Sequence, residues 1–217
     1  YTLCLSAFML SSGLIGDRYG RKRSWLAGVG IFVAGSLICA IAPNLPALLA
    51  GRVVQGIAGS LLIPGALSIL TQAFPDPRER AGVIGGWASF AAVSLVVGPV
   101  LGGILVQTVG WQSIFLINLP LGLFTITLGA VSIEETAHPE HAHLDLVGLA
   151  LSIQWLGALT FGLISAGERG WGGPRNITAI IARVVGLALL LGFEARQPRP
   201  TVAPGPFRAG RVCLRNV

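Results

Sequence analysis

This 217-residue chain is 53% hydrophobic and only 11% charged, whereas charged residues make up roughly 25% of a typical soluble domain. So few charges cannot cover the surface of a soluble protein, and the composition therefore indicates a membrane protein. The net charge of +6 does not indicate nucleic-acid binding, because most basic residues lie at the ends of apolar stretches, where membrane topology accounts for them. The sequence shows no nucleophile–base arrangement and no phosphate-binding loop, so we do not expect an enzyme.

Helices are the default for a chain that crosses lipid, because the backbone must hydrogen-bond internally, and each crossing needs about 20 apolar residues. We therefore expect an all-α membrane protein. Seven helical spans are predicted, over residues 1–15, 25–42, 47–74, 81–109, 113–133, 146–165 and 177–193. The chain starts with Tyr1 rather than Met, inside an apolar run, so we interpret it as a fragment that begins within a helix.

The segment between the first two apolar stretches is short and strongly basic, reading Gly-Leu-Ile-Gly-Asp-Arg-Tyr-Gly-Arg-Lys-Arg over residues 13–23. Lys and Arg in short loops mark the cytoplasmic side of a membrane protein, so we predict that this loop is cytoplasmic. Alternation then puts residues 75–80 on the same side and the uncharged turns at residues 43–46 and 110–112 outside. The turn of residues 167–175, which holds two arginines, also falls outside and is the one loop that does not fit.

Arg52 interrupts the third apolar stretch. An arginine within a span costs about 2.5–3.5 kcal/mol on insertion scales and therefore suggests a role. Gln55 follows three residues later on the same side of the helix, and Gly56 belongs to a face of small residues that suits close helix packing. Two interpretations stay open: Arg52 acts inside the bundle, or it lies near the outer end of the span and snorkels to the interface.

The fourth span contains the sequence Gly-Pro-Val-Leu-Gly-Gly from Gly98 to Gly103. Pro99 removes a backbone donor and should bend the helix, while Gly98 and Gly102 form a smooth face for a neighbour. Helices of this kind occur where two halves of a transporter rock against each other, although packing alone would also explain them.

These segments resemble signature motifs of the major facilitator superfamily. The basic segment is similar to the loop motif between family helices two and three, at Gly13, Asp17, Arg18, Gly20, Arg21 and Lys22. The fourth-helix motif of the family is matched by Arg52, Gln55 and Gly56. The fifth-helix motif typical of its antiporters is matched by Gly98, Pro99, Gly102 and Gly103, although Ser94 stands where that motif begins with glycine.

Three further segments are similar to the 14-helix drug:proton antiporters of the EmrB/QacA type, namely residues 111–122, 144–148 and 167–171. The resemblance implies that the chain covers family helices two to eight of a major facilitator superfamily helical bundle. It divides the chain into a partial N-terminal transporter bundle of five spans (residues 1–133), a cytoplasmic loop (134–145), two inserted transmembrane helices (146–193) and a polar cytoplasmic segment (194–217) that leads to a C-terminal bundle outside this chain.

The resemblance also implies a function: a secondary active transporter of the cell membrane that exports drugs or other lipophilic small molecules in exchange for protons, by alternating access and without a cofactor. Asp17 and Arg21 would hold the cytoplasmic gate, with Asp17 facing a helix N-terminus of the C-terminal bundle. Arg52 would face the central cavity and influence proton coupling through an acid that the sequence does not identify. The expected partners are a lipophilic substrate, protons, the lipid bilayer and the C-terminal bundle.

Three alternatives stay open at this point. The chain could be a truncated or structural membrane protein that transports nothing, or the exporter could carry another solute, such as an antibiotic made by its own host. His138, His141 and His143 with Glu140 could bind a metal, but this short loop carries no other strong ligand set, so we predict a flexible polar loop and no metal site.

Overall fold

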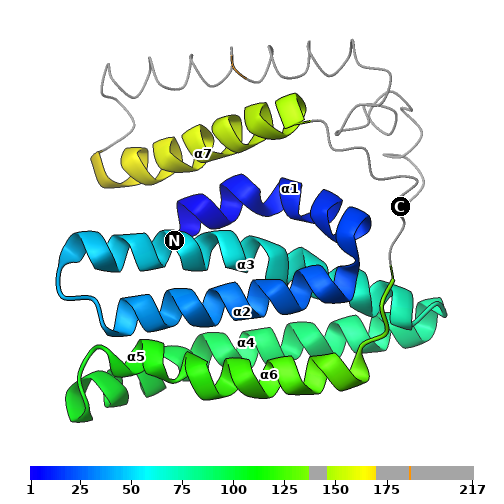
Figure 1. Ribbon diagram of the computed structural model, residues 1–217, viewed down its shortest axis with the longest axis horizontal. Coiled ribbons are helices and arrows are strands. Elements are labelled where there is room, and N and C mark those ends of the chain that lie inside the picture. Colours follow the sequence, from blue (N-terminus) through cyan, green and yellow to red (C-terminus); the bar gives the residue numbers. More distant parts are fainter. Residues whose placement is uncertain (137–145, 170–185, 187–217) are drawn as a thin grey trace. The chain divides into compact units, whose positions relative to one another are not determined.

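The computed structural model describes residues 1–136, 146–169 and 186, and the described part is built from α-helices without a strand (Figure 1). The chain divides into two compact units, residues 1–143 and 144–217. The first unit holds α1 (Thr2–Tyr19), α2 (Arg21–Ala40), α3 (Leu45–Ala73), α4 (Pro77–Thr108), α5 (Ser113–Leu116) and α6 (Asn118–Ser132). The second unit holds α7 (Leu146–Arg169).

Four segments of the described part are long and apolar enough to cross a membrane: α2, α3, α4, and α5 together with α6. They correspond to the second to fifth predicted spans. α1 overlaps the first predicted span, and α7 overlaps the sixth. α7 contains an apolar stretch at Ile153–Ile164. The predicted seventh span, the histidine-containing part of the 134–145 loop and the polar tail lie outside the described residues.

The predicted boundaries are wrong at the charged ends of the helices. α1 continues to Tyr19 and α2 begins at Arg21, so one non-helical residue, Gly20, replaces the predicted loop of residues 13–23. Hydropathy marks only the part of a helix that lies in hydrocarbon, whereas the backbone hydrogen bonds continue until a residue ends them. Gly20 ends them here with φ +98°, a conformation that glycine adopts without strain.

Side-chain caps explain the other early helix starts. The Asn44 side chain accepts a hydrogen bond from the backbone N–H of Ala47 at 3.0 Å, and α3 begins directly after it. The carboxylate of Asp76 accepts from the first turn of α4, which begins with Pro77 inside the predicted 75–80 loop. Asn and Asp are favoured at this position, and proline is favoured in the first turn, because both suit the unpaired N–H groups there.

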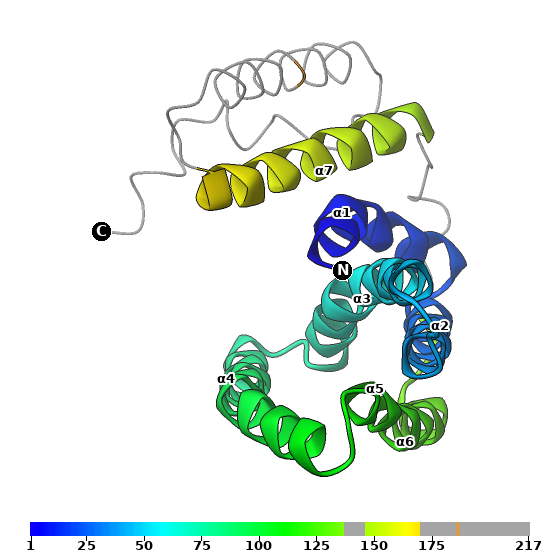
Figure 2. The same ribbon diagram turned by 90° about the vertical axis from the view of Figure 1, so that its left-hand side faces the viewer.

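Close backbone approach holds α2 against α3. A side chain at Gly35 would meet Cγ of Gln55 at 2.9 Å, and one at Gly51 would meet Sγ of Cys39 at 2.5 Å. In lipid, helices associate through this kind of small-residue packing rather than through the hydrophobic effect. α1 packs against α3, and α6 packs against α2, as Figure 2 shows with the helices close to end-on.

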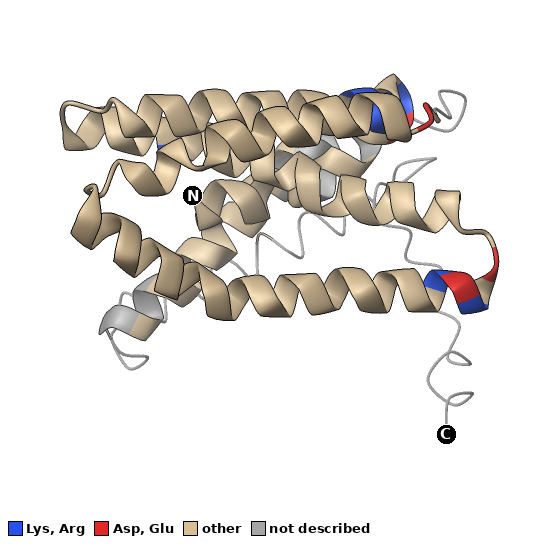
Figure 3. Ribbon diagram, turned by 90° about the horizontal axis from the view of Figure 1, so that it is seen from below, with Lys and Arg blue, Asp and Glu red and all other residues tan. Residues whose placement is uncertain are grey.

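α4 differs from its neighbours because none of its residues is buried. Among the described helices it contacts only α3 and α5, which flank it in the sequence. It continues as a helix through Pro99, and Figures 2 and 3 show that it changes direction along its length, as expected for an interior proline. A Cβ added at Gly98, Gly102 or Gly103 would meet no atom within 4 Å, so the described residues provide no neighbour for this face.

Charge is distributed unequally between the two ends of the first unit. Figure 3 shows Lys, Arg, Asp and Glu gathered at the end that holds the α1–α2 and α3–α4 turns. The turns between α2 and α3 and between α4 and α5, at the opposite end, carry no charged residue. This separation agrees with the prediction from the positive-inside rule, which expects the charged end on the cytoplasmic side.

Candidate functional site

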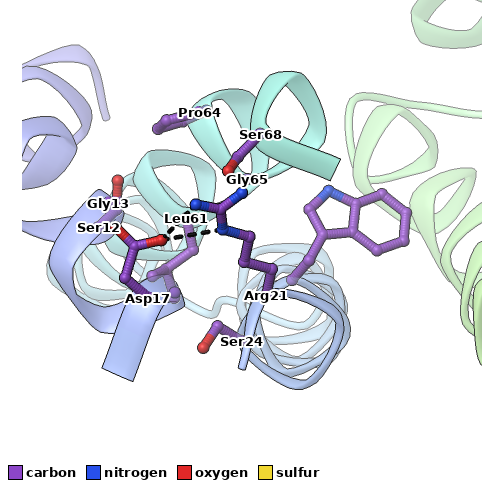
Figure 4. A pocket seen from close by; sticks show the side chains of 11 residues that line it. Ser12, Gly13, Asp17, Arg21, Ser24, Leu61, Pro64, Gly65 and Ser68 are labelled. Atoms are coloured by element: carbon purple, nitrogen blue, oxygen red, sulfur yellow. Dashed lines mark hydrogen bonds and ion pairs between the residues drawn. The ribbon is translucent and has the colours of Figure 1, made fainter. Parts of the chain in front are cut away.

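The charged end of the unit is organised around the turn between α1 and α2, residues 17–23, which we call the basic turn. Arg21 donates from Nε and from its terminal nitrogen to Oδ1 of Asp17, at 2.9 and 2.7 Å (Figure 4). The Arg21 side chain is 17% exposed and the Asp17 side chain 38%. No described residue donates to Oδ2 of Asp17, so this oxygen is available to another partner.

The Asp17–Arg21 pair borders a small hollow between the basic turn and α3. Its volume is about 20 Å³, which is enough for one water molecule. Gly13 and Gly16 line it on the α1 side, and the α3 side is formed by Leu61, Pro64, Gly65 and Ser68 (Figure 4). The pair is therefore partly shielded, although it lies at a helix end.

The remaining residues of the predicted loop motif do not join this pair. Arg18 is exposed, and its guanidinium lies 5.7 Å from the centre of the Tyr19 ring. Lys22 donates from Nζ to the backbone carbonyl of Ala130 at 2.7 Å. The end of α6 thus contacts the basic turn, and Glu135, which the sequence did not single out, accepts hydrogen bonds from it. The shared cytoplasmic side of both segments was the only signal in the sequence for this contact.

The second cluster lies within α3, at Arg52. Its guanidinium donates from Nη1 to Oε1 of Gln55 at 3.1 Å. The same guanidinium lies 4.6 Å from the centre of the Tyr1 ring and 5.9 Å from that of Phe115. Cation–π contacts of this kind contribute about 0.5–2 kcal/mol each, more when they are desolvated. The head group of Arg52 is therefore held by α3, by α5 and by Tyr1, the residue directly before α1.

Gln55 extends this cluster into the centre of the unit, where it is 1% exposed. Its Nε2 donates to Oγ of Ser36 at 2.7 Å, and Nδ2 of Asn118 donates to the same hydroxyl at 3.2 Å. A continuous polar path thus leads from Arg52 on α3 through Ser36 on α2 to Asn118 on α6. The sequence predicted Arg52 and Gln55 but not Ser36 or Asn118, because a single small polar residue in an apolar run has no distinctive spacing.

Gly56, the third predicted residue of this motif, permits the approach of α1. A side chain there would lie 2.6 Å from the carbonyl oxygen of Tyr1 and 2.7 Å from Cβ of Cys4. The glycine thereby brings the Tyr1 ring within reach of Arg52. No group of three or more potential metal ligands occurs among the described residues, and the three histidines lie outside them.

The sequence of the chain is similar to a known protein family and to several of its members. Residues 1–193 match the Major Facilitator Superfamily. The chain is 35% identical over 208 residues to "Multidrug resistance protein Stp" of Mycobacterium tuberculosis, which covers 96% of the chain and 39% of that protein. It is 35% identical over 211 residues to "Methylenomycin A resistance protein" of Bacillus subtilis. The aligned region covers 97% of the chain and 45% of that protein.

A third relative is the "Probable actinorhodin transporter" of Streptomyces coelicolor, 36% identical over 92% of the chain and 34% of that protein. The chain thus spans less than half the length of each of these relatives. The family match covers most of the chain, and the helices that cross the membrane fit it. The chain is therefore a multi-pass membrane protein that belongs to the Major Facilitator Superfamily.

Proposed function

We propose that this chain forms part of a secondary active transporter that exports lipophilic small molecules in exchange for protons. The observation that carries the proposal is the position of Arg52, a cation inside the bundle on a membrane-spanning helix. Arg52 is the eighth residue of α3, about 10 Å along the axis from its start at 1.5 Å per residue. Ionisable residues within spans that face the bundle interior mark substrate or proton pathways.

The contacts of Arg52 favour this role over snorkelling. A snorkelling arginine directs its head group to the membrane surface. Here the head group lies against Gln55 and two aromatic rings of the same unit. In the proposal, the uncompensated charge of Arg52 stabilises the ionised form of a nearby carboxylate. The carboxylate then binds a proton only at a lower pH than it would without Arg52. The described spans offer no such acid between their ends, so the carboxylate belongs to another helix.

Asp17 and Arg21 form the cytoplasmic gate in this proposal. The free Oδ2 of Asp17 accepts N–H groups at a helix N-terminus of the C-terminal bundle when the cytoplasmic side is closed. The bent α4, with Gly98, Pro99, Gly102 and Gly103, provides the surface along which the two bundles move. The proposal assigns residues 1–133 to part of the N-terminal bundle and residues 146–193 to the segment inserted after it.

Two kinds of substrate are compatible with the relatives, because one is named for multidrug resistance and others for resistance to, or transport of, a single compound. We propose lipophilic drugs as the substrate class, with an antibiotic made by the host as the second candidate. The two differ in breadth: a multidrug exporter moves several unrelated lipophilic cations, whereas a dedicated exporter moves one compound and its close analogues.

The test uses the full-length protein in inverted membrane vesicles with an imposed proton gradient. Ethidium and a second, unrelated lipophilic cation should accumulate in the vesicles without ATP, and a protonophore should abolish their accumulation. Accumulation that persists with the protonophore would disprove proton coupling. If no compound moves although the protein is present in the membrane in normal amounts, the structural alternative is supported instead.

A further inference from the structure

The segment after α6 folds over the first turn of α2. Glu135 accepts hydrogen bonds from the backbone N–H of Lys22 at 3.2 Å and of Arg23 at 3.1 Å. Its neighbour Thr136 accepts from the backbone N–H of Arg21 at 3.0 Å. The first N–H groups of a helix have no partner within the helix, so this segment satisfies three of them from outside.

The charge at this helix end explains why an acid is needed. The N-terminus of a helix carries about half a positive charge, and acidic residues are favoured in its first turn. α2 instead begins with three cations, Arg21, Lys22 and Arg23, and has no acid in its first turn. Glu135 supplies the missing negative charge from a distant part of the chain, and its Oε2 lies 3.5 Å from Nε of Arg23.

The contact is reciprocal. Lys22 donates from Nζ to the carbonyl of Ala130 at 2.7 Å, near the C-terminal end of α6, where carbonyl groups lack helical partners and cations are favoured. α2 thus provides a cation for the end of α6, and the chain beyond α6 provides an anion for the start of α2. Charge-assisted contacts in both directions therefore join these helix ends.

Gly20 has a second role in this arrangement. Besides its positive φ, it provides room for the acid, because a Cβ at position 20 would lie 2.5 Å from Oε1 and 2.7 Å from Cδ of Glu135. A side chain at Gly20 would therefore displace the carboxylate of Glu135 from this position. The glycine of the loop motif and the acid after α6 act as one unit.

We infer that Glu135 is a positioning residue of the cytoplasmic gate, which fixes the first turn of α2 and ties the Asp17–Arg21 pair to α6. Arg21 is the first residue of α2, so an ordered first turn holds its side chain at Asp17. The effect on transport rests on the proposed function, whereas the effect on the helix end does not.

The direct test is hydrogen exchange of the full-length protein in lipid nanodiscs. In Glu135→Ala, amides of residues 21–24 should exchange about fivefold faster, because losing an N-terminal cap destabilises a helix end by roughly that factor. Glu135→Gln, which keeps an acceptor oxygen but loses the charge, should give an intermediate rate. Glu134→Ala removes the same charge from the exposed neighbour and should leave the rate at the wild-type value. Equal rates in the two alanine variants would overturn the inference.

A transport assay provides the second readout. Glu135→Ala should lower the maximal rate severalfold with the KM for substrate nearly unchanged, and Glu135→Gln should restore part of the loss. A raised KM with an unchanged maximal rate would overturn the gate role. If the wild-type protein transports nothing, the proposed function fails, but the exchange result still decides whether Glu135 holds α2.

Discussion

The basic turn and the Arg52 cluster each fix an arginine, but with different partners. Arg21 pairs with the carboxylate of Asp17 at a helix end, where the pair is partly shielded but the Asp17 side chain remains 38% exposed. Arg52 is half-buried on a membrane-spanning helix, and its guanidinium contacts only neutral groups among the described residues: an amide oxygen and two aromatic rings. Neutral partners orient a cation without cancelling its charge.

This difference separates two tasks. At the surface, a pair of opposite charges can form and break at low cost, because exposed ion pairs contribute only about 0–1 kcal/mol. Within the membrane, an uncompensated cation attracts an anionic group strongly, because the dielectric constant is low. The first arrangement suits a gate that opens, and the second suits a fixed charge that affects protonation nearby.

The largest expected effect concerns the fixed charge. Arg52→Ala should lower proton-coupled transport by roughly tenfold to a hundredfold, since a hydrogen bond to a charged group contributes about 1.5–3 kcal/mol. It should also flatten the pH dependence of the remaining transport. Arg52→Lys keeps the charge but loses the planar contact with the rings, so it should retain the pH dependence at a reduced rate.

The matched control for Arg52 is Arg80→Ala, which removes an arginine that donates to the backbone carbonyls of Phe74 and Pro75 at the cytoplasmic end. Its transport should stay within about twofold of wild type, because these hydrogen bonds lie at a helix end, far along α3 and α4 from the Arg52 cluster. An unaltered pH dependence in Arg52→Ala would reduce Arg52 to a packing residue and remove the contrast between the two clusters.

A smaller effect is expected at the gate. Asp17→Asn should lower the maximal transport rate about two- to fivefold, in line with an exposed charge pair, and the loss should shrink at high salt. The amount of protein inserted in the membrane should not change. Asp76→Asn is a matched control on the same side, because asparagine also caps a helix well. Unchanged efflux in Asp17→Asn would contradict the gate assignment.

Much of this arrangement could be predicted from the sequence. Apolar length predicted the positions of the second to fifth spans, because a long apolar segment in lipid satisfies its own backbone hydrogen bonds as a helix. The sequence also predicted Arg52 and Gln55 as a pair, since a spacing of three residues puts both on one side of a helix. The sequence did not predict the helix ends, which depend on local caps such as Asp76 that hydropathy ignores.

The partners from distant segments could not be predicted. Asn118 and Glu135 reach their clusters only because α6 packs along α2, and that pairing depends on small residues rather than on a linear pattern. A side chain at Gly122, for example, would collide with Val33 of α2. A single sequence shows which residues are small, but not which helix each of them faces.

Helix packing beneath the Arg52 cluster can be tested by a pair of glycine substitutions. Gly56→Ala should lower the free energy of unfolding by about 1–3 kcal/mol, because its Cβ would crowd the Tyr1 carbonyl and Cys4. Gly86→Ala, on the exposed α4, has open space and should be neutral or slightly stabilising. Thermal unfolding in detergent measures both. Equal melting temperatures would show that α1 does not pack against α3 as closely as described.

The smallest expected effect tests whether α6 contributes to the Arg52 cluster at all. Asn118→Ala removes the hydrogen bond to Ser36 and should cost about 0.6 kcal/mol, the average for a hydrogen bond between membrane helices. Thr127→Ala is the control on the same helix, because its hydroxyl donates within α6 to the carbonyl of Phe124. Equal stability of the two variants would contradict a contribution of Asn118.

The pH dependence of transport then shows how far the influence of Asn118 reaches. If the path through Gln55 orients Arg52, Asn118→Ala should flatten that dependence in the same direction as Arg52→Ala, but less strongly, and the two substitutions together should change it by less than the sum of their separate effects. Independent shifts would mean that the two aromatic rings alone hold the guanidinium. The fixed charge would then depend on Tyr1, α3 and α5, and the contact with α6 would serve stability only.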